Sequence, residues 1–224
     1  PVTTAPEQLY IDGAFCDASD GATLDVVDPA TEQVIAKAPV ATTDDLNRAL
    51  DAAKRGWETW RETDAWTRSA TVRRVAEWIR EHAGLFAETL TAEQGKPLAE
   101  AQGEMGATAD QFDWYADEAR RLYGRVIDGH SRDHRLMVIR QPIGPVAAFS
   151  PWNFPALLSA RKIAPALATG CSIVLKPAEE APRTGFLLAQ ACHEAGVPAG
   201  VVNVVTGEPA QISRHLIASP VIRK

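Results

Sequence analysis

Two short segments of the sequence combine residue types that could do chemistry. The first, Phe149–Pro155, reads FSPWNFP and surrounds one amide side chain, Asn153, with aromatic residues and prolines. It follows a short apolar run, and ligands bind just outside the carboxyl ends of parallel strands. Asn153 could be a fixed carboxamide donor that stabilises an oxyanion. It could also be the N-cap of a helix with Pro155 in its first turn, and one residue can fill both roles.

The second segment, Leu175–Glu179, reads LKPAE and follows the next apolar run. We expect Lys176 and Glu179 at the same edge of the sheet as Asn153. One interpretation is a polar clamp, in which the lysine and the carboxylate both contact the hydroxyl groups of a ribose. The other is an ion pair in a solvated loop. The chemistry of the two residues does not choose between these interpretations.

The other reactive residue types form no known catalytic pattern. The sequence has no GxGxxG, GxxxxGK[ST], HExxH or GxSxG motif, and its five histidines are scattered. None of the three cysteines, Cys16, Cys171 and Cys192, has the helix N-terminus or nearby cation that lowers a thiol pKa. We therefore expect no cysteine nucleophile among them. Three cysteines are too few for a disulfide framework, and without a CxxC pair the sequence predicts no zinc site.

Composition excludes some classes of partner. The 224 residues include 29 acidic and 23 basic side chains, for a formal net charge of −6. This balance argues against sequence-independent binding of nucleic acid, which needs a basic face. No apolar run approaches the roughly 18–20 residues of a membrane span, and the first residues lack the pattern of a secretory signal. With few cysteines, the chain is expected in the cytoplasm, with no membrane and no nucleic-acid partner.

The elements that position these segments fall into three blocks. In residues 1–124, short apolar groups within turn-rich sequence predict strands, and three helices follow. Residues 125–142 are polar and then alternating, which predicts a protruding hairpin that is either an ordinary surface feature or a subunit-pairing arm. The predicted helices are 43–60 with Thr43 as its N-cap, one around 72–79, and Pro97–Tyr123 with Gly124 just past its end.

Residues 143–224 alternate between apolar runs and helical stretches, which predicts βαβ units and a parallel sheet. Pro165 is expected to break or kink the first helix. The alternation calls for another strand where the chain ends, at Val221–Lys224, and none follows, so we interpret the chain as truncated or as a fragment. The predicted strands are Val146–Phe149, Ser172–Leu175 and Val201–Val205, and the predicted helices are 155–169, 183–195 and 208–218.

Several long segments resemble the aldehyde dehydrogenase superfamily, and most closely its NAD(P)-dependent succinate-semialdehyde dehydrogenase branch. The resemblance implies an α/β fold of N-terminal helices plus an incomplete Rossmann-type parallel sheet, which is part of an NAD-binding domain. Residues 1–124 would be its first strands and helices, 125–142 an oligomerisation arm, and 143–224 its first βαβ units. The catalytic domain would be absent. The segments are LYIDG (9–13), DPAT (28–31), EQGKP (93–97), PIGPV (142–146), SPWNFP (150–155), PALATG (165–170), LKPAE (175–179) and AGVPAGVVNVVTG (195–207).

The resemblance also implies roles for individual residues. Asn153 matches the amide that stabilises the thiohemiacetal oxyanion. Lys176 and Glu179 match the residues that hold the adenosine ribose. Arg161, eight positions after Asn153, matches the arginine that meets the distal carboxylate of succinate semialdehyde. The other cofactor-binding positions implied are Phe149, Ser150, Pro151, Trp152 and Ala178.

The function implied is the N-terminal portion of an enzyme that oxidises a semialdehyde to its acid. Succinate semialdehyde is the expected substrate, and glutarate and 2-oxoglutarate semialdehydes share its terminal carboxylate. NAD is expected as the preferred cofactor over NADP, because Glu179 would face the ribose 2′ position. A homo-oligomer, either a dimer or a tetramer, is implied, which favours the subunit-pairing role of the hairpin.

The resemblance also identifies what the 224 residues lack. The family's nucleophilic cysteine and general-base glutamate match no position here, so the chain alone is expected to be inactive. Two alternatives stay open. One is a non-catalytic module that binds nucleotide or pairs with other subunits, and the other is a bare structural fragment.

Overall fold

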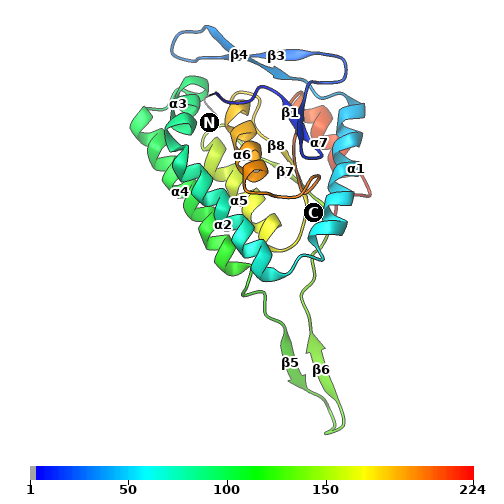
Figure 1. Ribbon diagram of the computed structural model, residues 1–224. Coiled ribbons are helices and arrows are strands. Elements are labelled where there is room, and N and C mark those ends of the chain that lie inside the picture. Colours follow the sequence, from blue (N-terminus) through cyan, green and yellow to red (C-terminus); the bar gives the residue numbers. More distant parts are fainter. Residues whose placement is uncertain (1–3) are drawn as a thin grey trace.

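The computed structural model describes residues 4–224 and arranges them in layers around a mixed sheet (Figure 1). The strand order is β2-β1-β9-β8-β7. One face of the sheet is covered by α1 (Thr43–Trp60) and α7 (Pro209–Ala218), and the other by α5 (Pro155–Ala168) and α6 (Pro182–Glu194). A further layer packs on the outside of α5 and α6 and consists of α2 (Ala65–Glu81), α3 (Ala83–Gln94) and α4 (Leu98–Glu118).

The sheet contains the parallel strands that the sequence predicts and two more. The parallel strands are β7 (Val146–Phe149), β8 (Ile173–Lys176) and β9 (Val202–Val204). The antiparallel hairpin of β1 (Leu9–Ile11) and β2 (Ala14–Cys16) extends them, because Tyr10 pairs with Val204. The N-terminal strands therefore belong to the same sheet as the predicted βαβ units.

Alternation along β8 fills a core on each side of the sheet. Ile173 and Leu175 pack into the core beneath α5 and α6, whereas Val174 packs into the core shared with α1 and α7. Strands that are covered on both faces read as continuous apolar runs, which is the pattern of this segment.

The N-cap of α1 lies one residue earlier than the sequence predicts. Thr42, not Thr43, is the N-cap, and it forms a capping box with Asp45. The Asp45 amide donates to Thr42 Oγ1 at 3.2 Å, and the Thr42 amide donates to Asp45 Oδ2 at 3.0 Å. This reciprocal pair satisfies two amides that a helix start otherwise leaves without partners.

The helices before the arm also differ from prediction. The sequence analysis missed α3, which buries Phe86 and Leu90 and ends at Gly95 in the left-handed conformation. The predicted helix Pro97–Tyr123 is shorter, because α4 ends at Glu118. Leu122 and Tyr123, beyond its end, are exposed, and Tyr123 is 72% exposed.

Pro165 does not break α5, so the predicted break does not occur. The helix continues to Ala168. Pro165 lies in the last turn of α5. Its missing amide removes one hydrogen bond there, and no further helical turn follows that this loss could disrupt. Gly170 and Gly196 follow the ends of α5 and α6 with positive φ, the conformation common just after a helix end.

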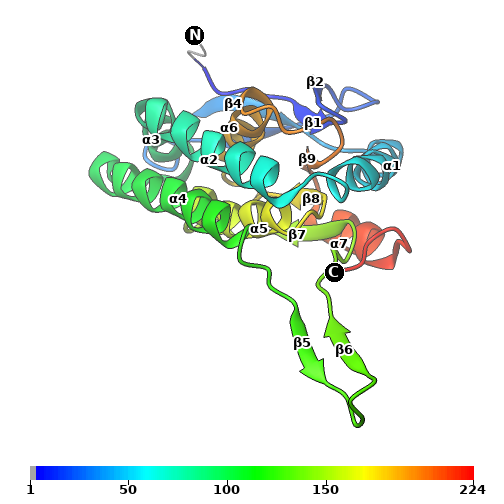
Figure 2. The same cartoon turned by 60° about the horizontal axis from the view of Figure 1, so that its bottom comes forward.

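Two separate two-stranded sheets complete the fold. One crosses the top of the molecule in Figure 1 and consists of β3 (Thr23–Val27) and β4 (Val34–Pro39). The other is the predicted hairpin of β5 (Arg125–Asp128) and β6 (Arg135–Val138), which projects away from the layers (Figure 2). Every residue of β5 and β6 is exposed.

The last residues lie beside β7. The Arg223 amide donates to the Pro145 carbonyl at 2.8 Å, and the Ala147 amide donates to the Lys224 carbonyl at 2.9 Å. They occupy the place where the alternation predicts a further strand. Across residues 4–224, no helix is long and apolar enough to cross a bilayer.

Candidate functional site

The two segments singled out in the sequence meet at one edge of the sheet. β7 and β8 end together, with Phe149 paired to Lys176. Ser150 continues this pairing, since its amide donates to the Lys176 carbonyl at 3.2 Å. The Ser150 hydroxyl also hydrogen-bonds the Ser159 hydroxyl at 2.8 Å, which ties the end of β7 to α5. The predicted juxtaposition is therefore confirmed.

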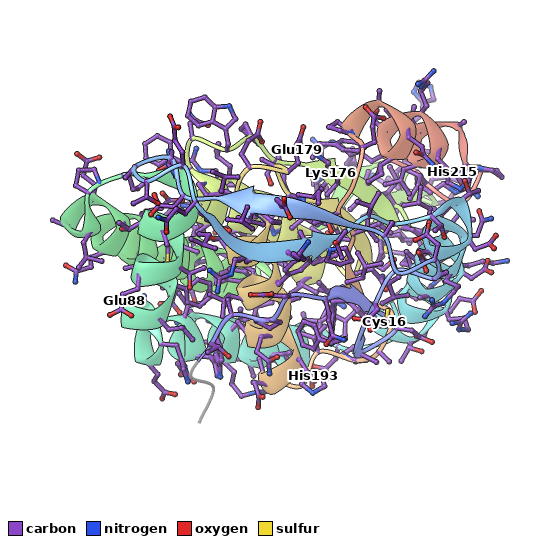
Figure 3. The ribbon with its side chains drawn as sticks, turned by 90° about the horizontal axis from the view of Figure 1, so that it is seen from above. Cys16, Glu88, Lys176, Glu179, His193 and His215 are labelled. Carbon is purple, nitrogen blue, oxygen red and sulfur yellow. The ribbon has the colours of Figure 1, made fainter. Side chains whose placement is uncertain are left out.

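Lys176 and Glu179 form an ion pair at this edge, and Figure 3 shows them side by side. The lysine side chain is 6% exposed and the glutamate 37%. Ala178, between them, is buried. The pair is thus only partly solvated. A nearly buried ammonium is held beside a carboxylate that still reaches solvent, and a buried charge needs such a partner.

Asn153 lies in the exposed loop between β7 and α5. The N-cap of α5 is Phe154, and no side chain of this loop caps the helix. The interpretation of Asn153 as an N-cap is therefore wrong. Within residues 4–224 its carboxamide forms no hydrogen bond. Its backbone carbonyl, by contrast, accepts a hydrogen bond from Lys96 Nζ at 3.1 Å.

A buried carboxylate on α4 caps α5 in place of the loop. Glu104 Oε1 accepts hydrogen bonds from the amides of Ala156 at 3.0 Å and Leu157 at 3.1 Å. Pro155, the first helical residue, has no amide to satisfy. Glu104 Oε2 pairs with Lys96 Nζ, and both side chains are almost fully buried. One cation–carboxylate pair thus holds both the helix start and the Asn153 carbonyl.

A second buried carboxylate, on α3, caps α6 in the same way. Glu93 accepts hydrogen bonds from the amides of Arg183 and Thr184, each at 2.9 Å, and from the Thr184 hydroxyl. These hydrogen bonds lower its pKa, but burial has the larger effect and raises the pKa to about 7. Pro182 again starts the helix, which has no side-chain cap of its own.

A cleft of about 590 Å³ opens next to these groups, between β3 and the carboxyl edge of the sheet. Glu179 and Trp152 line it, so two of the predicted cofactor-binding residues share one wall. The charged residues of the lining are all acidic, which suits hydroxyl groups and does not suit phosphates. The lining residues are Leu24, Asp25, Val26, Val27, Pro29, Glu93, Gln94, Trp152, Glu179 and Glu180.

Arg161 lies on α5, where it is exposed and forms no ion pair with any residue between 4 and 224. About 9 Å of helix separates it from Pro155, at 1.5 Å per residue. An unpaired arginine two turns along the helix that follows Asn153 is free to meet an anion. The structure does not bring Arg161 into contact with Lys176 or Glu179.

The cysteines and two of the histidines lie apart from this edge. Cys171 and Cys192 are buried, and burial raises the pKa of the Cys192 thiol to about 12. Cys16, His193 and His215 are all separated from Lys176 and Glu179 in Figure 3. Neither buried thiol has the setting of a nucleophile, which needs a lowered pKa and access to solvent.

Sequence reasoning missed the roles of Lys96, Glu104 and Glu93. Lys96 and Glu93 fall within the segment EQGKP, which contributed only to the resemblance. The sequences at the starts of α5 and α6 do indicate that these helices are capped by residues from elsewhere. Pro155 and Pro182 are preceded by Phe154 and Ala181, which cannot cap a helix. Their caps had to come from elsewhere in the fold.

Comparison with known proteins gives a consistent result. The model of the aldehyde dehydrogenase family matches residues 15–224. A glutarate-semialdehyde dehydrogenase of Pseudomonas putida is 46% identical over 218 residues, which are 97% of this chain and 45% of that protein. A succinate-semialdehyde dehydrogenase of Escherichia coli, whose name specifies NADP(+), is 44% identical over 218 residues, which are again 97% of this chain and 45% of that protein.

Solved structures agree with these relatives. The crystal structure of succinate-semialdehyde dehydrogenase from Burkholderia pseudomallei superposes with a TM-score of 0.96 at 40% identity. The match covers 98% of this chain and 46% of that one. The chain thus spans a little under half the length of the relatives it matches. On sequence and on structure, it belongs to the aldehyde dehydrogenase family.

Proposed function

We propose that this chain is the N-terminal, cofactor-binding portion of an NAD-dependent dehydrogenase that oxidises a semialdehyde to the carboxylic acid. The observation that carries the proposal is the shared edge of β7 and β8. There the loop that carries the unbonded carboxamide of Asn153 and the segment that carries the Lys176–Glu179 pair follow adjacent strand ends.

The residues at this edge fit an adenosine ribose. Lys176 offers donors and Glu179 offers acceptors, so together they suit a pair of vicinal hydroxyl groups. Phe149, Ser150, Pro151 and Trp152 would supply the neighbouring backbone. A bound nicotinamide cofactor would accept a hydride from the substrate. A 2′-phosphate would meet the Glu179 carboxylate, and this repulsion favours NAD over NADP.

Asn153 would stabilise negative charge on the aldehyde oxygen once a thiolate has attacked the carbonyl. Its role is that of one oxyanion donor, held in place before the reaction. The cysteine that attacks and the glutamate that activates water would come from residues outside the segments matched here, since neither Cys171 nor Cys192 is suited to attack.

Arg161 would select substrates with a second, anionic end. Arginine binds carboxylates through charge-assisted hydrogen bonds. The names of the relatives from Pseudomonas putida and Escherichia coli specify glutarate and succinate semialdehydes, which both carry a terminal carboxylate. This agreement supports a semialdehyde as substrate, with succinate semialdehyde as our first choice.

The hairpin of β5 and β6 would pair subunits in a dimer or tetramer located in the cytoplasm. Large apolar side chains cover it, including Val126 at 71% exposed and Met137 at 74%. Exposed apolar patches of this kind mark interaction surfaces.

Two measurements test the proposal. The reading frame that contains this chain should continue past Lys224 and encode a cysteine and a glutamate in the family's motifs. The enzyme that it encodes should then oxidise succinate semialdehyde with a higher kcat/KM for NAD than for NADP. A reading frame that stops at Lys224 would instead favour the non-catalytic module. A higher kcat/KM with NADP would refute the cofactor preference alone.

A further inference from the structure

We infer that the buried Lys96–Glu104 pair is a positioning device, which sets the place of Asn153 and thereby the rate of the chemical step. This inference rests on the proposed function of Asn153. It assigns a part in the reaction to Glu104 of α4 and to Lys96 in the turn before α4, and neither residue pairs with Lys176 or Glu179.

The pair holds the chain at Asn153 and immediately after it. Lys96 Nζ donates to the Asn153 carbonyl at 3.1 Å and lies 4.3 Å from the centre of the Phe154 ring. Glu104 holds the first two amides of α5 that can donate, those of Ala156 and Leu157. The hydrogen bond from Lys96 therefore fixes the Asn153 backbone, while the Asn153 carboxamide stays exposed.

No other contact can replace this pair. Phe154 provides no side-chain cap and Pro155 has no amide, so without Glu104 the buried amide of Ala156 and the partly buried amide of Leu157 lose their partner. Both side chains of the pair are 8% exposed or less. Removing either partner leaves the other charge buried and uncompensated, so the local structure must shift to hydrate it.

The position of a donor matters more to the rate than to binding. Misplacing a catalytic group by about 1 Å can lower a rate on the order of 100-fold. Lys176 and Glu179, which would bind the cofactor, form their own ion pair and do not contact Lys96 or Glu104 through a hydrogen bond or ion pair. The expected signature is thus a lower kcat with an almost unchanged KM for NAD.

The test compares variants of the complete enzyme that carries this chain. Lys96→Met removes the donor to the Asn153 carbonyl and keeps the aliphatic stem beside Phe154. Glu104→Gln keeps the shape and removes the charge. Each should lower kcat about 10- to 100-fold, with KM for NAD changed less than about twofold. Lys96→Arg, which keeps a cationic donor, should retain more of kcat than Lys96→Met.

The stability control is Asp45→Asn. Asp45 is also a buried carboxylate that caps a helix, but that helix is α1, on the other face of the sheet. Its loss should lower the unfolding temperature by a similar amount. At a temperature where circular dichroism shows every variant folded, Asp45→Asn should keep its kcat.

Amide hydrogen exchange gives a readout that does not depend on turnover. Peptides that contain Ala156 and Leu157 should exchange faster in Lys96→Met and Glu104→Gln, and not in Asp45→Asn. If the unmodified enzyme oxidises no aldehyde, the proposed function fails, and exchange alone decides whether the pair fixes this loop. Unchanged exchange, or a kcat no lower than that of Asp45→Asn, would overturn the inference.

Discussion

Asn153 combines a fixed backbone with a free side chain. Its carbonyl is bonded to Lys96, whereas its carboxamide has no partner within residues 4–224. Replacing Asn153 should therefore lower the rate of the reaction and leave the stability of the fold almost unchanged. In the complete enzyme, Asn153→Ala should lower kcat by roughly 10²–10³, the usual effect of losing one oxyanion donor. The unfolding temperature and the KM for NAD should change little. A variant that keeps most of its kcat while chemistry limits the rate would show that Asn153 has no such role.

Arg161 has no ion-pair partner in the described chain, so its charge is available to a substrate. Arg161→Ala should raise the KM for succinate semialdehyde by at least about tenfold, and the KM for butanal much less, because only the first has a distal carboxylate. The matched control is Arg214→Ala, since Arg214 is an exposed arginine on α7. Steady-state kinetics with both aldehydes measures the effect. Equal effects on the two substrates would remove Arg161 from the site.

At the scale of elements, the start of α6 makes stability depend on pH. Burial raises the pKa of Glu93 from its ordinary 4.5 to about 7. Between these values the folded protein holds a proton that the unfolded chain has lost, so stability falls as pH rises through this range and then levels off. The loss is on the order of 3 kcal/mol.

Urea unfolding of the protein and of Glu93→Gln at about pH 5 and about pH 8 measures this effect. The glutamine cannot ionise, so all other titrations cancel in the difference between the two proteins. We expect the protein with Glu93 to lose stability relative to the variant as pH rises. A difference that is constant, or that changes in the opposite direction, would contradict the assignment.

Local patterns predicted the elements that their own residues determine. The apolar runs of β7, β8 and β9 identify the parallel strands, and the residues after them identify the candidate site. Features that depend on distant residues were missed or misassigned. Tyr10 joins the sheet through Val204, and Glu104 caps a helix that starts at Pro155. Local sequence does not identify the distant partner in such pairings. The interpretation of Asn153 as an N-cap is wrong because the cap of α5 comes from Glu104, about 50 residues earlier.

At the scale of the whole molecule, the hairpin of β5 and β6 is the arm that would pair subunits, and every residue of both strands is exposed in the single chain. Val126 and Met137 face each other across β5 and β6 and are both largely exposed. Replacing both with aspartate should weaken self-association, because charge opposes the burial of an apolar surface. The control is Val34→Asp, at an exposed valine of the other two-stranded ribbon, β4. Sedimentation should show smaller assemblies only for the arm variant, and an unchanged mass would argue against a pairing role.

The central claim is that these residues form the cofactor-binding half of a semialdehyde dehydrogenase and depend on the rest of the enzyme for chemistry. Oxidation requires a thiolate to attack the carbonyl and a base to activate water, and Asn153 can only stabilise the charge that results. The most direct measurement is NADH formation from NAD and succinate semialdehyde. It compares the complete enzyme with purified chain that mass spectrometry shows to end at Lys224. We predict turnover by the complete enzyme and none by the chain alone. A complete enzyme that oxidises no semialdehyde would contradict the account, as would turnover by the isolated chain that disappears in Cys171→Ala.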